Sequence, residues 1–458
     1  MLFHTWPFAL FFLVFYGVYL AVKSTRLRLP WLLLSSYAFY AWWNPLYVAL
    51  ILYATTVDFL VVVLMAKSHR KRLWLTVSVA NNLLLLGTFK YAAFLAESLN
   101  SLLATLGTAY AVPAPDLLLP VGISFFVFQS MSYTIDYYRG KVDKEPNFLR
   151  YAVFVSLFPR LVAGPIERAS HVLPQLRETP KVGLDDVADG LSLFVVGFFK
   201  KVALADFLAL YVDKVYGAPA EFQAPALLLA TFAFAWQIYF DFSGYTDMAR
   251  GIARTMGIRL MLNFNNPYLA TSLRDFWGRW HISLSSWFKD YVYIPLGGNR
   301  RGSVRTYVNM CLTMVISGLW HGASWTFVIW GAVHAIGRCL TRWLEGTTFY
   351  KDRVPTFAKQ LLVFGIVTFA WIFFKAQSLG DAWLIVTRIF TSGWADPACP
   401  LLMLGFCLAV WLYQFVHESR CERLLSVAPV RVGLVVLMVL YLAIFSTASG
   451  QAFIYVQF

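Results

Sequence analysis

The chain has 458 residues, of which 59% are hydrophobic and only 14% are charged, and its mean hydropathy is +0.62. So few charges cannot cover a water-facing surface of this size, which excludes an ordinary soluble enzyme and predicts a polytopic membrane protein. The net charge of +14 fits Lys and Arg in short cytoplasmic loops, so it gives no reason to expect nucleic acid as a partner. The positive charge is also compatible with an anionic substrate that donates a group from the cytoplasmic side.

The N-terminal part of the chain predicts spans whose connecting loops alternate in charge. The apolar run 3–22 is followed by the basic loop 23–28, and the third run ends at the basic segment 67–72. The loop 97–116 contains no Lys or Arg, and the fifth run leads to basic residues from Arg139 onward. Because basic loops stay in the cytoplasm, this order predicts an uncleaved first span with its N-terminus on the outer side of the membrane.

Two segments in the middle of the chain admit more than one arrangement. Residues 148–165 lie between two basic loops, so they either cross the membrane beside an unidentified span or dip in and return. Pro159 and Gly164 suit a re-entrant element, because irregular backbone at membrane depth must be shielded by protein. The segment 190–216 is equally ambiguous, whereas the run 223–246 predicts a span.

The C-terminal part predicts a helical hairpin followed by further spans. Helices are expected at about 305–319 and 323–338, on either side of the turn "WHG". Further spans are expected at 357–375, 399–416 and 433–450, with 380–392 lying flat on the membrane.

The predicted fold class is all-α, a polytopic membrane protein with about eleven or twelve transmembrane helices plus re-entrant or amphipathic helices. No internal repeat is visible, which argues against the inverted-repeat transporter folds. We expect one transmembrane domain over 1–458, with N-terminal spans at 1–140, a catalytic core at about 148–340 and C-terminal spans at 355–458.

The segment "RDFWGRWHISLSSWFKDY" (274–291) places a histidine among serines, aromatic residues and charges. Interpreted as one helix, it gathers most large apolar side chains on one arc and its acidic residues on the opposite one. His281 falls at the border of the apolar arc, with Ser285 and Lys289 following it at i+4 and i+8. The pattern predicts an amphipathic helix at an interface or in a re-entrant wall. The alternative is a surface helix whose histidine is merely polar.

A second histidine, His321, lies inside the hydrophobic hairpin in "GLWHGASW". An imidazole there is costly unless it faces a cavity or a partner. Small neighbours allow a helix or a substrate to approach the ring closely; they are Gly318, Gly322, Ala323 and Ser324. Trp320 and Trp325 can exclude water from it. The alternative is a histidine that hydrogen-bonds two helices together for stability, and a structural role of this kind is our interpretation of His334.

Two imidazoles in such surroundings indicate proton transfer. The unperturbed pKa of histidine, about 6.5, suits acid–base chemistry near neutrality, and burial favours the neutral, basic form. Such a base can take the proton of a hydroxyl whose oxygen attacks an activated acyl group. No GxSxG turn or Cys/His pairing offers another nucleophile, and the five cysteines show no metal or disulfide pattern. We therefore predict no metal and no bound cofactor.

Other polar residues within or beside the predicted spans either mark a functional path or hydrogen-bond helices together. They are Asp58, Asn81, Asn82, Lys90, Gln129, Asp136, Gln237 and Asp241. Of these, we favour Asp241 as a wall or orienting group of the site. The candidate residues for binding the donor of the activated acyl group, or for lining a tunnel that leads to the histidines, are Asp241, Ser243, Tyr245, Arg279, Ser285, Lys289, Trp320 and Ser324.

Five motifs in this order resemble the membrane-bound O-acyltransferase superfamily. They are "PVGISFFVFQSMSYTIDYYRG", "FPRLVAGPIER", "DFSGYTDMARGIARTMGIRLMLNFNNPY", "RDFWGRWHISLSSWFKDYVYIPLGGNRRG" and "GLWHGASWTFVIWGAVHA". The likeness extends strongly over about residues 1–340 and is greatest to the bacterial alginate O-acetyltransferase branch. The D-alanyl transfer branch shares the helix and the turn, but it usually lacks "IPLGGNRRG".

The resemblance implies a helical bundle around a tunnel, in the bacterial inner membrane, with His321 and His281 at the two signature positions. It implies transfer of an acetyl group from a cytoplasmic thioester, with acetyl-CoA as donor substrate. A periplasmic acetyltransferase partner would then O-acetylate an exported polysaccharide such as alginate. Basic residues around His281 would meet the phosphates of coenzyme A, unless they only reflect membrane topology; they are Arg274, Arg279, Lys289, Arg300, Arg301 and Arg305.

Three functions are weighed on this basis. The first is the O-acetyltransferase just described, with D-alanyl or other acyl transfer to a cell-wall polymer as its variant. The second is a non-catalytic transporter of polysaccharide or lipid, and the third is a scaffold that recruits periplasmic enzymes. The two histidine motifs together favour the acetyltransferase, because neither other function has an evident use for them.

Overall fold

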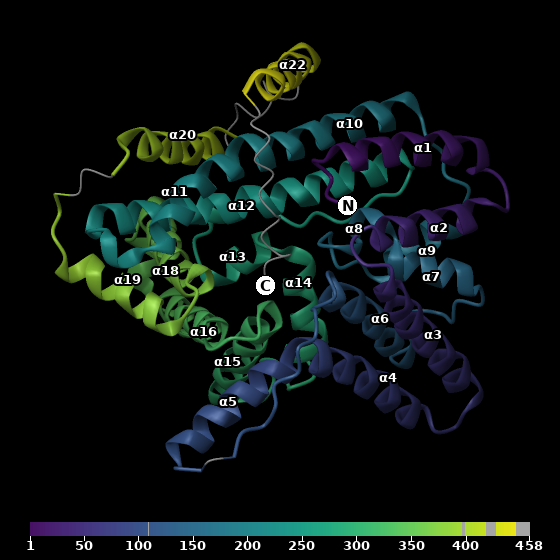
Figure 1. Cartoon of the computed structure of the whole chain (residues 1–458), viewed down its shortest axis with the longest axis horizontal. Helices are drawn as coiled ribbons and strands as arrows, with labels where there is room; N and C mark the ends of the chain where they lie inside the picture. The colour runs from purple at the N-terminus through teal and green to yellow at the C-terminus, as the bar shows by residue number, and fades with distance from the viewer. Residues whose placement is uncertain (109, 396–398, 418–426, 446–458) are drawn as a thin grey trace. The chain divides into compact units, whose positions relative to one another are not determined.

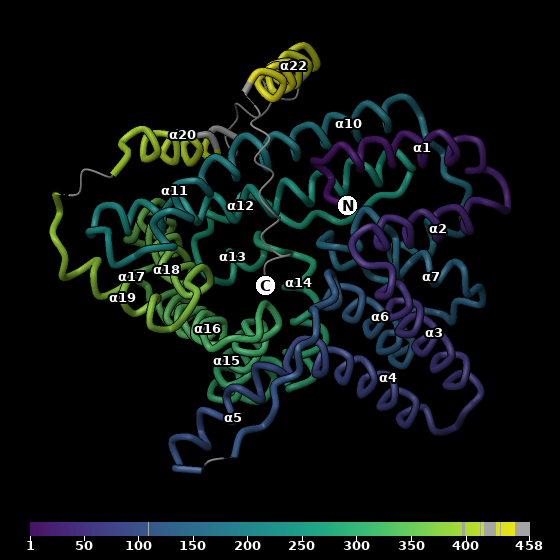
Figure 2. The backbone as a smooth tube through the Cα atoms, viewed as in Figure 1, coloured from purple at the N-terminus to yellow at the C-terminus, as the bar shows by residue number. Residues whose placement is uncertain are grey.

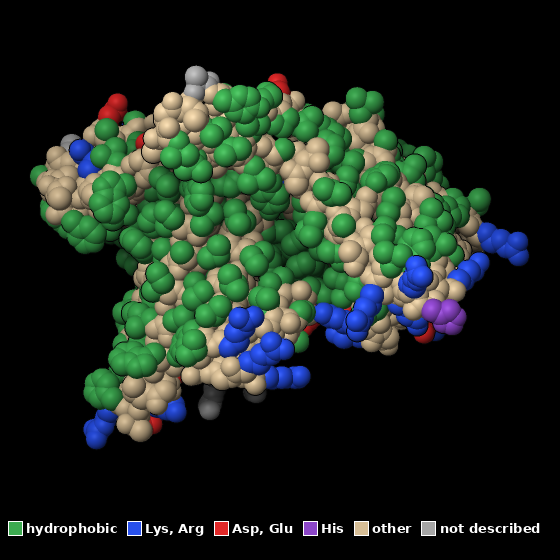
Figure 3. Space-filling view, turned by 90° about the horizontal axis from the view of Figure 1, so that it is seen from below, with side chains coloured by type: hydrophobic (Ala, Val, Ile, Leu, Met, Phe, Trp, Pro, Cys, Tyr) green, Lys and Arg blue, Asp and Glu red, His purple; other side chains and the backbone are tan. Residues whose placement is uncertain are grey.

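The computed structural model describes residues 1–108, 110–395, 399–417 and 427–445 (Figure 1). Over these residues the regular secondary structure is helical, with no strand, which confirms the all-α fold class. Four described helical segments are long and apolar enough to cross a membrane: Leu46–Lys67, Lys71–Thr105, Ala224–Thr255 and Thr356–Lys375. The total of eleven or twelve crossings stays a prediction. Many large hydrophobic side chains are exposed, as a lipid-facing surface requires (Figure 3).

The chain divides into two compact units, which are described separately. The first contains Met1–Phe194 and Thr246–Met261, and the second contains Val195–Tyr245 and the described part of 262–458. Both histidines of the predicted site belong to the second unit. The expectation of a single transmembrane domain stays a prediction.

The first unit is built from short and medium helices. They are α1 (Trp6–Val22), α2 (Arg28–Ala41), α3 (Leu46–Lys67), α4 (Lys71–Leu86), α5 (Ala92–Thr105), α6 (Ile123–Tyr138), α7 (Phe148–Ser156), α8 (Phe158–Leu161), α9 (Ala169–Arg177) and most of α10 (Leu184–Phe199). Polar side chains connect distant parts of this unit. The Tyr19 hydroxyl donates to the carbonyl of Met256 at 2.6 Å, and the Arg28 guanidinium donates to that of Leu176.

A buried carboxylate holds three helices of the first unit together. Asp58 of α3 accepts hydrogen bonds from Ser78 Oγ (2.6 Å) and Asn82 Nδ2 of α4, and from Ser130 Oγ of α6. All four side chains are buried. For Asp58 and Asn82, the structure therefore supports helix-to-helix hydrogen bonding, one of the two uses considered from the sequence.

The ambiguous segment 148–165 is a broken helix in the structure. Helix α7 ends at Ser156, and α8 begins at Phe158 after Leu157, whose φ of −53° and ψ of 114° are not helical. The Phe158 N–H is satisfied by Ser36 Oγ at 3.1 Å, and the break is buried. This is the irregular, protein-shielded backbone that the re-entrant alternative requires.

The second unit carries the long helices of the predicted core. They are α11 (Asp206–Gly217), α12 (Ala224–Thr255, up to Tyr245), α13 (Leu273–Arg279), α14 (Ile282–Phe288), α15 (Gly302–His321), α16 (Trp325–Gly346), α17 (Thr348–Asp352), α18 (Thr356–Lys375), α19 (Leu379–Thr391), α20 (Leu401–His417) and α22 (Ala428–Phe445). The predicted hairpin is confirmed as α15 and α16, which lie side by side (Figure 2). The predicted span 433–450 corresponds to α22 as far as Phe445, and its last residues lie outside the described part of the chain.

Glycines allow the two hairpin helices to pack closely. A Cβ on Gly331 of α16 would lie 2.6 Å from the carbonyl oxygen of Met314 and 3.0 Å from Cα of Val315, both on α15. A Cβ on Gly318 would likewise overlap the carbonyl oxygen of Phe327. Since the atoms in the way are backbone, they cannot move aside as a flexible side chain could.

Replacing Gly331 by Val is expected to push the hairpin apart and lower the free energy of unfolding by about 1–3 kcal/mol. The thermal midpoint of the purified protein in detergent measures this. The control is Gly365→Ala in α18, where nothing lies within 4 Å of the added Cβ. That control should leave the midpoint unchanged or raise it slightly, because alanine favours a helix. Equal midpoints for Gly331→Val and the wild type would refute close glycine packing.

Candidate functional site

The segment 274–291 is not the single amphipathic helix that its pattern suggested. Helix α13 ends at Arg279, Trp280 is extended (φ −99°, ψ 127°), and α14 begins at Ile282. A π-helical turn follows at Lys289–Tyr293. The break occurs at His281, whose φ of +44° is in the left-handed region and rare for a residue with a side chain. Backbone strain of this kind concentrates at functional sites.

Asn263 holds the break in place. Its backbone carbonyl accepts from the N–H of Ile282 at 2.9 Å, and its side-chain Oδ1 accepts from the N–H of Ser283 at 3.1 Å and from Ser283 Oγ at 2.9 Å. Asn263 thus satisfies the first donors of α14 in the way that a capping residue does. Because this contact comes from a residue 18 positions upstream of His281, helical periodicity could not predict it.

The same asparagine determines which nitrogen of His281 carries the proton. The Nδ1 atom lies 3.2 Å from Asn263 Oδ1, and that atom must be the oxygen because it also accepts from the Ser283 N–H. A carbonyl oxygen only accepts, so Nδ1 donates and Nε2 carries the lone pair. The ring is fully buried and packs edge-on against Phe242, with 4.7 Å between ring centroids.

His321 is the last residue of α15, at the turn of the hairpin. Its buried ring lies in an aromatic enclosure: centroid distances are 5.0 Å to Trp320, 4.9 Å to Trp330 and 5.5 Å to Phe374. The Ser324 hydroxyl caps the N-terminus of α16, where it accepts a hydrogen bond from the N–H of Thr326.

The indole of Trp320 contacts both imidazoles. Its ring centroid is 6.2 Å from that of His281 and 5.0 Å from that of His321. The second unit therefore brings the two predicted histidines to either side of one aromatic ring, although they are 40 positions apart in the sequence. A tunnel that joins them across the membrane stays a prediction.

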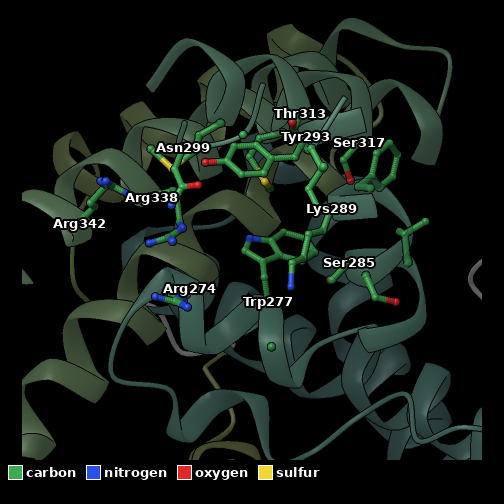
Figure 4. A pocket seen from close by; sticks show the side chains of 18 of the residues that line it. Arg274, Trp277, Ser285, Lys289, Tyr293, Asn299, Thr313, Ser317, Arg338 and Arg342 are labelled. Atoms are coloured by element: carbon green, nitrogen blue, oxygen red, sulfur yellow. The ribbon is translucent and has the colours of Figure 1, made fainter. Parts of the chain in front are cut away.

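A pocket of about 620 Å³ lies next to this pair, in the same unit (Figure 4). Ser285 and Lys289, two of the predicted donor-binding residues, line it, and so do Arg274 and Arg300. Neither histidine is part of the wall. Its lining does include Ile282, which follows His281, and Ser317, which lies one helical turn before His321. A volume of this size is typical of a small-molecule site.

Two cations of the pocket were not predicted from the sequence. Arg338 and Arg342 line it from α16, and Arg338 interacts electrostatically with Glu345, with Arg342 and with Arg274 of α13. Figure 4 shows these three arginines on one side of the pocket, Ser317 on the other and Lys289 between them. The i, i+4 spacing of Arg338 and Arg342 on one helix was the available signal, but nothing in the sequence connects it to α13.

The remaining predicted residues lie elsewhere in the second unit. Arg279 is paired with Asp275 on its own helix, with 2.8 Å between Nε and Oδ1, and does not line the pocket. Asp241, Ser243 and Tyr245 are buried on α12, also outside the pocket. Trp320 lies between the histidines.

Asp241 belongs to a buried ion network that centres on Lys201. The Lys201 Nζ atom is 2.6 Å from Asp241 Oδ1 and 2.9 Å from Asp206 Oδ1. Lys201 comes from the π-helical turn Lys200–Ala205. Helix α12 approaches this turn so closely that a Cβ on Gly244 would lie 3.1 Å from the backbone nitrogen of Lys201. Sequence reasoning missed Lys201, although a lysine separated from Asp206 by four apolar residues was a visible signal.

The described residues contain no group of three or more His, Cys, Asp or Glu side chains that could hold a metal ion. The site described here is instead a pair of buried imidazoles beside a pocket with a cationic side.

Comparison with known proteins identifies the class of this chain. Residues 139–380, which include both histidines, match the model of the membrane-bound O-acyltransferase family. The chain is 40% identical over 388 residues to a probable alginate O-acetylase of Azotobacter vinelandii, covering 84% of this chain and 77% of the relative. It is also 40% identical to the corresponding Pseudomonas aeruginosa protein, with 84% and 74% covered, and 36% identical to a peptidoglycan O-acetyltransferase of Helicobacter pylori, with 77% and 72% covered.

The protein is thus a polytopic membrane acyltransferase. More particularly, the chain belongs to the membrane-bound O-acyltransferase family and is similar over most of its length to bacterial O-acetyltransferases.

Proposed function

We propose that this enzyme takes an acetyl group from cytoplasmic acetyl-CoA and passes it across the bacterial inner membrane for O-acetylation of an exported polysaccharide. The observation that carries this proposal is the pocket with an arginine cluster on one side and Ser317, one turn from His321, on the other. Its two sides match the two ends of an acyl-CoA, a polyanion and a thioester.

Arg274, Arg338 and Arg342 are suited to the phosphates of coenzyme A. Guanidinium groups bind phosphate oxygens through paired, charge-assisted hydrogen bonds. Glu345 partly compensates the charge of Arg338, whereas Arg274 and Arg342 oppose it, so a bound anion would add favourable contacts for this cluster. Lys289, between the arginines and Ser317 in Figure 4, lies where the donor chain would pass toward the histidines.

In this proposal His321 is the general base of acyl transfer. It removes the proton of the acceptor hydroxyl while the oxygen attacks the thioester carbonyl, and the coenzyme A thiolate leaves. Its aromatic enclosure excludes water, which would otherwise hydrolyse the thioester. His281 supports the reaction from the other side of Trp320, with its tautomer set by Asn263.

The acceptor side of the proposal rests on the named relatives and on charge topology. Relatives named for alginate and for peptidoglycan support a cell-surface polysaccharide as the final acceptor, with alginate favoured. A periplasmic acetyltransferase partner is proposed to receive the acetyl group. The basic loops of the N-terminal spans support a periplasmic N-terminus.

The donor is tested with purified protein, its periplasmic partner and labelled acetyl-CoA. We expect label transfer, and we expect Arg338→Gln combined with Lys289→Gln to raise the KM for acetyl-CoA by roughly tenfold, with a smaller change in kcat. That factor corresponds to about 1.4 kcal/mol, a moderate estimate for the loss of one phosphate contact and one cation beside the donor chain.

The matched control removes two charges that do not line the pocket, by Arg301→Gln combined with Arg305→Gln. It should keep the wild-type KM. If both double variants changed the KM for acetyl-CoA equally, the pocket cations would only reflect the orientation of the protein in the membrane. Complete inertness of the wild type toward acetyl-CoA, with activity on another acyl thioester, would refute acetyl-CoA as donor.

A further inference from the structure

A third histidine of the second unit is buried without any hydrogen bond. His334 of α16 is fully buried, and neither Nδ1 nor Nε2 has a hydrogen-bond partner. Its ring lies among Trp330 (4.7 Å between centroids), Trp277 (5.1 Å), Phe276 (6.0 Å) and Trp371 (6.3 Å). From the sequence alone, His334 is interpreted as a structural residue.

This environment is unfavourable for a histidine whose only task is packing. A buried polar atom without a partner loses its hydration and gains nothing in return, whereas a phenylalanine would fill the same aromatic enclosure without that loss. The indole Nε1 atoms of Trp277 and Trp330 are buried and unpaired as well. The enclosure therefore holds two indole donors and an imidazole with one donor and one acceptor, the kinds of group to which an internal water binds.

The position of His334 links the pocket to His321. On one side it contacts Trp277, which lines the pocket. On the other side it contacts Trp330, whose ring packs edge-on against His321 with 4.9 Å between centroids. One indole therefore separates the two imidazoles, and another separates His334 from the pocket.

We propose that His334 relays the proton from His321 to the donor pocket, a role that rests on the proposed acyl transfer. The hydroxyl oxygen forms a bond to the acyl carbon, the carbon–sulfur bond breaks, and the electron pair leaves with the thiolate. His321 holds the hydroxyl proton, and the thiolate in the pocket needs one. His334 passes that proton through internal water, so the reaction ends with the ester, the free thiol and a neutral His321.

The test replaces His334 by Phe, which keeps the aromatic packing and removes both nitrogens, and by Gln, which restores polar groups. The variants are produced in cells that make the polymer, and O-acetyl esters on the exported polymer are measured. The expected results are an unchanged or higher thermal midpoint for His334→Phe, at least tenfold less acetylation, and partial recovery with His334→Gln. With purified protein, His334→Phe should lower kcat, leave the KM of the donor unchanged and increase the solvent isotope effect.

Phe276→Leu is the control, because it alters the same enclosure without removing a nitrogen; it should lower the thermal midpoint more than the acetylation. Full acetylation by His334→Phe would overturn the relay and leave the proposed function intact. Equal activity losses in Phe276→Leu and His334→Phe would also overturn it, because packing would then explain both. A wild-type protein that supports no acetylation of any polymer would overturn the proposed function and the relay together.

Discussion

Replacing His321 by Ala is expected to reduce acetyl transfer by at least about 100-fold, the lower end of what a general base contributes. The side chain is buried against Trp320, Trp330 and Phe374, so alanine also leaves a cavity. His321→Gln, which fills more of the space but cannot act as a base near neutrality, should lose activity to the same extent. Labelled acetyl transfer and O-acetyl esters on the exported polymer are the measurements.

His171→Ala is the matched control. This histidine is half exposed, pairs with Glu167 and belongs to the first unit, outside the candidate site. When this variant and the wild type are present in the membrane at equal levels, their rates of acetyl transfer should be equal. Full acetylation in both His321 variants would remove His321 from the mechanism, whereas a failure of polymer export, with any polymer that still emerges fully decorated, would favour a transporter.

Elements with a local signal in the sequence were predicted well. The hairpin of α15 and α16 follows from two apolar runs of helical length on either side of "WHG", and it places His321 at the turn. The lipid-facing character follows from composition, which needs no tertiary information. The His281 and His321 motifs could be paired because the order of the motifs resembles that of a family, and the comparison shows that the chain belongs to this family.

Features that depend on contacts between distant segments were not predictable from periodicity. The break at His281 depends on Asn263, and the second set of pocket cations comes from α16. His334 looked structural because a sequence does not show whether a buried nitrogen has a partner. For the break and for the second set of cations, the missing information was the identity of the neighbouring element, and without Asn263 the pattern of 274–291 wrongly suggested one continuous helix.

Asp241 illustrates the same limit and leads to a strong prediction on stability. The sequence marked it as a wall of the site or as structural glue, and the structure places it in the ion network with Lys201 and Asp206. Two buried carboxylates share one ammonium group there, so the lysine offsets both the repulsion between them and much of the cost of their burial. The contacts thus support a structural role for Asp241.

Lys201→Met is therefore expected to lower the free energy of unfolding by about 3–5 kcal/mol, because it leaves two buried carboxylates without a cation. Methionine keeps most of the volume, so the loss reports charge rather than packing. Combining Lys201→Met with Asp206→Asn and Asp241→Asn removes all three charges and should recover most of the stability. Lys214→Met, at an exposed position of α11, controls for the lost charge and should leave the thermal midpoint in detergent unchanged. If Lys201→Met alone is as stable as the wild type, the network contributes nothing to stability; if the triple variant is stable but inactive, Asp241 serves the reaction as well as the fold.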